Sequence, residues 1–421
     1  MDKLTHLLDK TLMPISNKLS NNKYLAALQD GLMFSMPILI VGSVCIIIGD
    51  FPLPIFQETM TSLLGDIWSQ WCWDIMVPAT TGLVSLLSII GIANSLALKN
   101  KVEPLSAVGI SVSAYFILLA QMEDGGFAVS NFEAQGLFTA MITALIATSI
   151  YSYTVHKNWI IKMPESVPTG IARSFNSIIP VALTVIIFAI VRIVTDAMGA
   201  PLNDLIFTWI QTPFTAIVSS PIGLIIIYIL YMLLWGFGIH SAYIFNPILE
   251  PIYLASLALN VNAINAGEAA TQIITKPFLD SVAFMGGAGN MLALVIAIFL
   301  VSKRNDYKVI GKLGLVPALF NISEPLMFGL PVVMNPILII PMIGATLAGL
   351  GIGALATQIG IMAHTYVLIP WTTPPVISAF LATGGDIMSG VVGLVILIVS
   401  VLIYIPFVKV MNKERAEQVE E

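Results

Sequence analysis

Long apolar stretches alternate along the chain with short polar segments. A membrane-spanning helix needs about 20 mostly apolar residues. The less regular region from 240 to 390 leaves room for further spans, so we expect about ten spans in an all-α polytopic membrane protein. The clean stretches predict helices at 24–48, 75–98, 104–121, 135–155, 178–198, 222–239 and 391–408.

The first 22 residues show a different pattern. Apolar side chains recur there at helical spacing on one face, and most charged side chains fall on other faces. This pattern predicts an interfacial amphipathic helix over 1–22, lying on the membrane surface. Its apolar face consists of Leu4, Leu7, Leu8, Leu12 and Ile15.

Composition and charge agree with a membrane protein. Hydrophobic residues make up 57% of the chain and charged residues 10%, whereas a soluble domain carries about 25% charge. Sixteen of the 18 Lys and Arg lie at the N-terminus and at 99–101, 157–173, 303–312 and 409–415. Because pairs of spans separate these groups, the positive-inside rule places both termini in the cytoplasm and predicts an even number of spans.

The two halves of the chain differ in regularity. The smooth part, 23–200, is predicted to be a scaffold and dimerisation domain of about five spans. The part from 201 to 409, with about five more spans, is predicted to be the substrate-binding transport domain, followed by a cytoplasmic tail, 410–421. Two polar interruptions, at 246–251 and 323–325, indicate a binding site and predict two related hairpins.

The strongest chemical signal is the stretch N-I-S-E-P-L-M-F-G-L-P-V-V-M-N-P at 321–336. It places Glu324, three prolines and a glycine in a very apolar part of the chain. Proline removes a backbone donor, and a broken backbone at membrane depth persists only where protein surrounds it. We therefore expect Glu324 on a broken or re-entrant element that faces a polar substrate. The alternative is a Glu in the headgroup region, next to the basic loop that ends at Lys312.

Several other residues are candidates for a sugar site. His240 follows the Gly-rich run W-G-F-G-I-H-S and can exchange hydrogen bonds with a hydroxyl; alone, it fits an interfacial histidine equally well. Trp235 and Trp371 offer aromatic faces of the kind that sugars stack on, although Trp371 also fits an interfacial belt. The run G-G-A-G-N at 286–290 offers backbone amides to a ligand or allows close helix packing.

Other functional classes lack their motifs. There is no P-loop, no His or Cys spacing of a metal site and no basic nucleic-acid patch. No cofactor, metal or nucleic-acid partner is expected, and no stand-alone catalysis. Cys45 and Cys72 show no disulfide or metal spacing.

Four motifs together resemble a known family. These are G-I-H-S at 238–241, F-L-D-S-V-A-F-M-G-G-A-G-N at 278–290, the S-E-P run from Ser323 to Pro336, and M-P-E-S-V-P at 163–168. They are similar to the Enzyme IIC subunit of the bacterial phosphoenolpyruvate-dependent phosphotransferase system, in its lactose/cellobiose/diacetylchitobiose branch. The resemblance covers nearly the whole chain. It implies ten spans, two re-entrant hairpins, a homodimer built on the N-terminal half and an elevator-type movement of the C-terminal half.

The resemblance also implies roles for particular residues. Glu324 and His240 match the pair that holds the sugar hydroxyl to be phosphorylated. Ser323 and Ser241 stand where the family usually has Asn and Gly, so the exact disaccharide stays open. The expected substrate-binding set is Glu324, His240, Trp235, Ser323, Asn321, Trp371, Gly287 and Asn290.

The function implied is group translocation across the bacterial cytoplasmic membrane. A β-linked disaccharide enters and is phosphorylated by the phosphocysteine of a separate Enzyme IIB, which Enzyme IIA serves. Neither Cys45 nor Cys72 suits that phosphate role. One alternative is an ion-coupled secondary sugar transporter with Glu324 as its proton site. A transferase acting on lipid would need paired acidic metal ligands, and Asp306 stands alone; a receptor that transports nothing is a third alternative.

Overall fold

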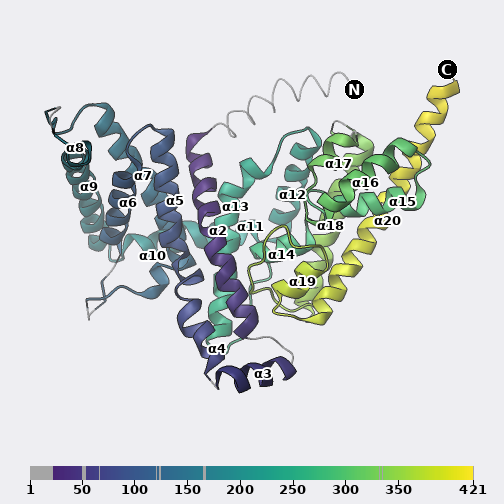
Figure 1. The fold of residues 1–421 in the computed structure, drawn as a ribbon, viewed down its shortest axis with the longest axis horizontal. Coiled ribbons are helices and arrows are strands. Elements are labelled where there is room, and N and C mark those ends of the chain that lie inside the picture. Colours follow the sequence, from purple (N-terminus) through teal and green to yellow (C-terminus); the bar gives the residue numbers. More distant parts are fainter. Residues whose placement is uncertain are drawn as a thin grey trace. The chain divides into compact units, whose positions relative to one another are not determined.

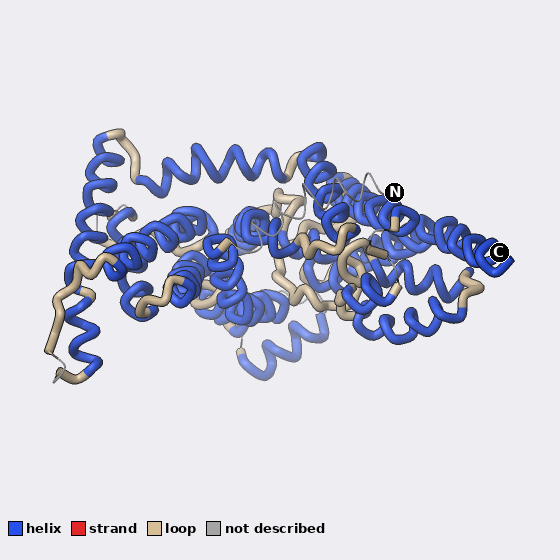
Figure 2. Tube along the Cα trace, turned by 90° about the horizontal axis from the view of Figure 1, so that it is seen from above, coloured by secondary structure: helices blue, strands red, loops and turns tan. Residues whose placement is uncertain are grey.

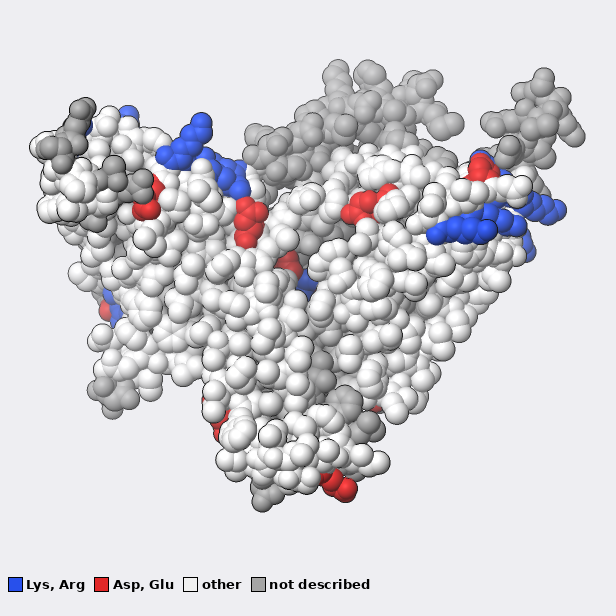
Figure 3. Space-filling model, in the orientation of Figure 1, with Lys and Arg blue, Asp and Glu red and all other residues white. Residues whose placement is uncertain are grey.

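The computed structural model describes residues 22–49, 54–65, 67–119, 121–122, 125–164, 167–330, 332–333 and 335–420. Within these ranges the chain is helical, and its one β-bridge joins Gln121 and Phe127 (Figures 1 and 2). The amphipathic helix predicted over 1–22 lies outside the described residues apart from its last position. Most of the surface seen in Figure 3 is uncharged, and Lys and Arg occur in a few groups.

Seven helical segments among the described residues are long and apolar enough to cross a membrane. A pair bent by 74°, Leu202–Val218 with α12 (Pro221–Gly236), adds an eighth if it is one span. Two shorter apolar helices are α6 (Pro104–Leu118) and α15 (Met291–Val301). The chain is thus a multi-pass membrane protein, and the number of ten spans stays a prediction. The seven segments contain α2 (Lys23–Gly49), α4–α5 (Trp68–Trp71 and Val84–Lys99), α7 (Leu137–His156), α9 (Ile178–Ala197), α13 (Ala242–Asn265), α18 (Pro336–Gln358) and α20 (Ile387–Glu420).

Shorter helices connect or interrupt these segments. Helix α20 continues from the last span through the predicted tail to Glu420, and the cytoplasmic location of that tail stays a prediction. The shorter helices are α3 (Pro54–Leu64), α8 (Thr169–Asn176), α10 (Leu202–Ile206), α11 (Thr212–Val218), α14 (Lys276–Val282), α16 (Asn305–Leu319), α17 (Glu324–Gly329) and α19 (Ile377–Ala382). The π and 3-10 turns are η1 (Cys72–Met76), η2 (Thr81–Leu83), η3 (Val129–Asn131), η4 (Ala134–Gly136) and η5 (Phe207–Gln211).

Several helices begin with the same local signal, a polar cap with a proline at one of the next two positions. Ser220 accepts the Gly223 N–H at 3.0 Å at the start of α12, and Asn335 accepts the Ile337 N–H at 3.0 Å at the start of α18. A capping oxygen satisfies one of the free amides of a first turn, and proline supplies the helical φ without needing a partner for an N–H. These local choices set where the helices start.

The chain forms two compact units. Unit 1 comprises 1–41, 78–217 and 246–255, and unit 2 comprises 42–77, 218–245 and 256–421. The predicted division of roles at about residue 200 stays a prediction.

In unit 1, helices α5, α6, α7 and α9 pack through small side chains. The buried cluster includes Ala97, Ala107, Ala114 and Ala147, and small residues let membrane helices approach closely. Gly31 of α2 lies so near α5 that an added Cβ would stand 2.5 Å from the Ile92 nitrogen. Close packing of regular helices therefore defines this bundle.

In unit 2, helices α15, α18 and α20 form the buried core, with α12, α16 and α17 against it. The core includes Met291, Leu294, Met342 and Tyr404. Helices α14 and α19 pack on one another and on this core, and the irregular segments 266–275 and 359–376 precede them. Unit 2 thus combines long helices with broken backbone.

One predicted interruption is wrong. Pro247 and Pro251 lie inside the continuous helix α13 (Ala242–Asn265), so the chain does not break at 246–251. Each proline removes one backbone donor, yet the helix runs through both positions without a break. The two re-entrant hairpins stay a prediction, and α13 does not supply one.

Candidate functional site

The predicted break around Glu324 is confirmed. Helix α16 ends at Leu319, four non-helical residues follow, and Glu324 begins the six-residue helix α17. The next long helix starts only at Pro336. Asn321 turns the chain with a left-handed φ of 60°, a conformation that asparagine tolerates better than most residues. The carboxylate therefore stands at a helix start within broken backbone.

His240 reaches the same place from the turn that follows α12. Helix α12 ends at Gly236, and Gly238, with φ of 78°, reverses the chain before His240. The imidazole Nε2 lies 3.5 Å from the Glu324 Oε1, and the two side chains are 36% and 44% exposed. This distance is at the outer limit of a direct hydrogen bond. Both groups stay accessible, so a ligand hydroxyl can bond to either.

Two aromatic rings hold the imidazole. The buried Trp235 ring lies with its centroid 4.3 Å from that of His240, and the Tyr243 ring lies 4.4 Å away. Among the described residues, the buried Nδ1 of His240 has no hydrogen-bond partner. Ring packing therefore orients the imidazole. Tyr243 was not predicted as a site residue, although its position three residues after His240 was a usable signal.

Asn321 connects three segments around the site. Its Oδ1 accepts the Gly286 N–H at 2.8 Å. Its Nδ2 donates to the carbonyls of Trp371 at 2.7 Å and Thr373 at 2.9 Å. The amide thus ties the glycine turn and the 371–373 loop to the residue three positions before Glu324. The Trp371 side chain is 56% exposed, and this structure links it to the site through its carbonyl.

The glycine turn lies directly against the broken segment. Gly287 has φ of 89°, and an added Cβ would stand 2.6 Å from the Ser323 Cβ and 2.7 Å from the Asn321 carbonyl oxygen. Only glycine fits at this distance and in this backbone conformation. The structure therefore brings Gly287, Asn321, Ser323 and Glu324 together from two stretches of sequence.

Asn290 lies deeper and is fully buried. Its Oδ1 accepts the Met285 N–H at 2.9 Å, and its Nδ2 donates to the Ala345 carbonyl at 3.2 Å and the Ser400 hydroxyl at 3.0 Å. The side-chain amide of Asn290 thus already bonds to protein groups. In the part of the chain that the structure describes, no group of three or more His, Cys, Asp or Glu could hold a metal ion.

This arrangement defines a class of protein. Apolar helices surround a broken segment that presents a carboxylate, an imidazole and an indole, which is the chemistry of a membrane transport protein for a polar solute. The chain belongs to the family described as "Phosphotransferase system, EIIC", which matches residues 29–346. The resemblance inferred from the motifs is thereby confirmed, and the chain is an EIIC permease component.

Named relatives cover almost the whole chain. The cellobiose-specific EIIC component of Geobacillus stearothermophilus is 33% identical, over 99% of this chain and 96% of that protein. The lactose-specific EIICB component of Staphylococcus haemolyticus (strain JCSC1435) is 31% identical, over 99% of this chain and 72% of that protein. The solved structure of ChbC, the IIC component of the N,N'-diacetylchitobiose-specific phosphotransferase system, matches with a TM-score of 0.93 at 33% identity, over 98% of this chain and 99% of that one.

Proposed function

We propose that this protein binds a β-linked disaccharide of the cellobiose, chitobiose and lactose class and carries it into the cell as it is phosphorylated. The observation that carries the proposal is the meeting of the Glu324 carboxylate and the His240 imidazole at 3.5 Å, both accessible. The relatives named for cellobiose, lactose and diacetylchitobiose support this substrate class.

The proposed chemistry assigns Glu324 as general base. It accepts the proton of one sugar hydroxyl while that oxygen attacks the phosphorus of a phosphocysteine on Enzyme IIB. The P–S bond breaks, the cysteine leaves as thiolate, and the sugar becomes an anion retained in the cell. His240 shares the hydrogen bond to the same hydroxyl.

Direct sugar contacts are proposed for a subset of the predicted residues. The side chains of Trp235, which packs against His240, of Ser323, which precedes Glu324, and of Trp371 are assigned to the sugar. The Gly287 N–H already donates to the Phe284 carbonyl at 2.9 Å, so Gly287 is assigned a positioning role. For Asn321 and Asn290 we propose a positioning role, because their amides already bond protein groups. Sugar contact by all these residues stays a prediction.

A second chain supplies the phosphate. Cys45 lies in α2 and Cys72 in the π turn η1, within or beside a candidate span, and neither suits a soluble phosphate exchange. The relative whose name joins the C and B components supports Enzyme IIB as partner. Enzyme IIA would act indirectly, by phosphorylating Enzyme IIB.

The proposed topology places both termini in the cytoplasm of a bacterium, with the protein in its inner membrane. Within unit 1, Lys23 donates to Asn100 at 2.7 Å, and Asn100 donates to Ser152 at 3.0 Å, so the basic groups at 23 and 99–101 share one end of the bundle. Within unit 2, Asn412 accepts the Lys303 N–H at 2.9 Å, which joins the groups at 303–312 and 409–415. These two groupings support the proposed topology, because the positive-inside rule places basic loops on one side of the membrane.

Transport is proposed to follow an elevator-type movement in a homodimer. Unit 2 contains Glu324, His240 and the segments that hold them, and unit 1 is the regular bundle. We propose that the C-terminal part of unit 2, within 201–409, carries the sugar across and that the N-terminal half, 23–200, forms the dimer contact.

The test is uptake of radiolabelled cellobiose, chitobiose and lactose by membrane vesicles, with and without phosphorylated Enzyme IIB. We expect sugar phosphate only with the partner, and at least about a hundredfold loss in Glu324→Gln, the size typical of removing a general base. Glu268→Gln is the matched control, since Glu268 is exposed in the loop after α13. Free sugar that accumulates without Enzyme IIB, and is lost on adding a protonophore, would instead make the protein an ion-coupled transporter.

A further inference from the structure

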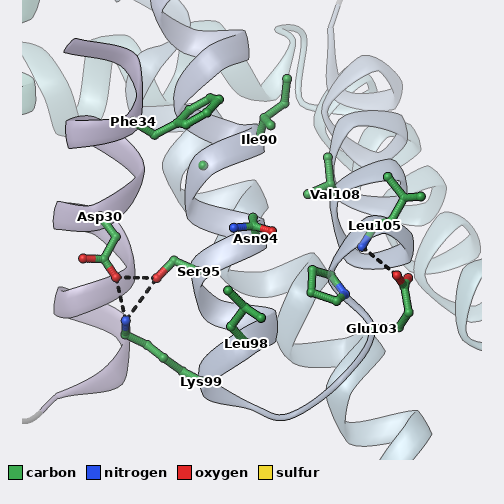
Figure 4. A pocket seen from close by; sticks show the side chains of 12 residues that line it. Asp30, Phe34, Ile90, Asn94, Ser95, Leu98, Lys99, Glu103, Leu105 and Val108 are labelled. Atoms are coloured by element: carbon green, nitrogen blue, oxygen red, sulfur yellow. Dashed lines mark hydrogen bonds and ion pairs between the residues drawn. The ribbon is translucent and has the colours of Figure 1, made fainter. Parts of the chain in front are cut away.

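Unit 1 contains a cavity unconnected to the assignments above. Its volume is about 690 Å³, within the range of small-molecule sites. Figure 4 shows that Asp30 and Phe34 of α2, Asn94, Ser95 and Lys99 of α5, and Glu103 before α6 border it. It is therefore an open cleft along one face of α5.

One end of the cleft is charged. Asp30 Oδ2 accepts from Lys99 Nζ and from Ser95 Oγ, both at 2.6 Å. Among the described residues, the other carboxylate oxygen of Asp30 has no hydrogen-bond partner. Glu103 adds a second carboxylate and caps α6. The lining thus carries one ammonium and two carboxylates, a net charge of −1. The ammonium can bind a phosphate, and the excess negative charge favours a ligand that also carries an amine.

The remaining walls are apolar. Phe34, Leu98 and Leu105 all line the cleft and are 50%, 60% and 79% exposed. Exposed apolar walls next to a charged end match an amphiphile with a zwitterionic head. The basic residues Lys23, Lys99 and Lys101 lie at this end, so the positive-inside rule assigns it to the cytoplasmic leaflet.

Asn94 supplies an independent observation. It is exposed, and within the described part of the chain its side-chain amide makes no hydrogen bond. It precedes Lys99 by five residues on α5, or about 7.5 Å along the axis at 1.5 Å per residue. With Lys99 at headgroup level, the amide lies near the edge of the hydrocarbon, where an unpaired polar group is unfavourable. An ester carbonyl of a glycerolipid would satisfy it at that depth.

We propose that this cleft binds one phospholipid with a primary amine in a zwitterionic head, of the phosphatidylethanolamine type. Lys99 bonds the phosphate, the second carboxylate oxygen of Asp30 accepts from the ammonium, and Asn94 donates to an ester carbonyl. The negative charge of Glu103 attracts the same ammonium. The acyl chains lie along Phe34, Leu98 and Leu105.

The test uses the purified full-length protein, delipidated in detergent and titrated with dioleoyl phosphatidylethanolamine, phosphatidylcholine or phosphatidylglycerol under native mass spectrometry. We expect the ethanolamine lipid to bind best and to lose about tenfold in affinity in Asn94→Leu and in Asp30→Asn. Asn94→Leu breaks no internal hydrogen bond, so its folding should be unchanged. Asp196→Asn is the control, because it removes a comparable ion pair, to Arg192 at 2.7 Å, outside the cleft.

Three results would overturn the proposal. Equal binding of phosphatidylcholine would exclude recognition of a hydrogen-bonding amine, and a preference for phosphatidylglycerol would exclude the zwitterionic head. Unchanged lipid binding in both variants, together with a changed oligomeric state, would mean that a second copy of the chain covers the cleft. None of these results depends on sugar transport, so the proposed function is tested separately.

Discussion

The helical bundle of unit 1 and the broken segments of unit 2 differ in how their backbone polar groups find hydrogen-bond partners. Both must satisfy backbone polar groups in apolar surroundings. In unit 1, helices α5 to α7 satisfy their own backbone, and hydroxyls such as Ser152 bond to a carbonyl four residues earlier at 2.7 Å. In unit 2, the backbone leaves the helix at several places, and asparagine side chains take over as partners.

Three asparagines, which we call the amide clips, do this work: Asn260, Asn290 and Asn321. Asn260 is fully buried, and its Oδ1 accepts the N–H groups of Thr271 and Gln272 at 3.1 and 2.8 Å. Its Nδ2 donates to the carbonyls of Gln272 and Thr365 at 2.8 and 2.9 Å. A primary amide suits this role because it offers two donors and an acceptor with two lone pairs.

The difference explains where a polar site can form. Regular helices leave no backbone amide free for a ligand, whereas clipped, irregular segments hold Glu324, Ser323 and the glycine turn at defined places without a helix. The clips let unit 2 present polar groups while the backbone groups that the three amides bond are satisfied.

The largest effect is expected when one of the amide clips, Asn321, is replaced. Asn321→Gly keeps the left-handed backbone but deletes three hydrogen bonds, so we expect the free energy of unfolding to fall by about 3 kcal/mol. Sugar affinity should fall with it, because Gly286 and Trp371 lose their common anchor. Thermal unfolding in detergent and calorimetric sugar binding measure both.

Asn158→Gly is the matched control for the clip. Asn158 also has a left-handed φ, 58°, but stands in the turn after α7. If both variants lost the same free energy of unfolding, Asn321 would act only through its backbone conformation.

A smaller effect is expected from the close approach at the glycine turn. Gly287→Ala places a methyl group against Ser323 and Asn321, whereas Gly267→Ala, at φ of 73°, meets nothing within 4 Å. Both variants bear the cost of a left-handed alanine, about 1–2 kcal/mol. We expect Gly287→Ala to lose about 2 kcal/mol more, from overpacking. Equal unfolding midpoints for Gly287→Ala and Gly267→Ala would show that the glycine turn shifts away from Ser323 without loss of stability.

The smallest effect is expected in the regular bundle. Ser111 and Thr148 share an interhelical hydroxyl contact at 3.2 Å, and such bonds contribute about 0.6 kcal/mol on average. Ser111→Ala should therefore shift stability by no more than that relative to Ser149→Ala, whose hydroxyl bonds only its own helix. If Ser111→Ala lowered the free energy of unfolding by about 3 kcal/mol, as expected for Asn321→Gly, side-chain hydrogen bonds would matter equally in the two units.

Much of the fold and part of the site were predictable because their signals are local. Apolar length predicted the helices at 24–48, 135–155 and 178–198, and the S-E-P run predicted the break at Glu324. The prediction failed at Pro247 and Pro251, because tertiary packing decides whether a helix continues through a proline.

The sequence alone determined the membrane class, which rests on apolar length and composition, and its motifs indicated the family. The resemblance to that family also implied the pairing of Glu324 with His240. Only the tertiary structure decided that Asn290 and Asn321 bond backbone groups, that the Tyr243 ring packs against His240, and that a cleft opens beside Asp30. The hydrogen bonds of Asn321 reach 35 to 52 positions along the chain. No local pattern encodes such partners, because a side-chain amide bonds to whatever the folded chain places within about 3 Å of it.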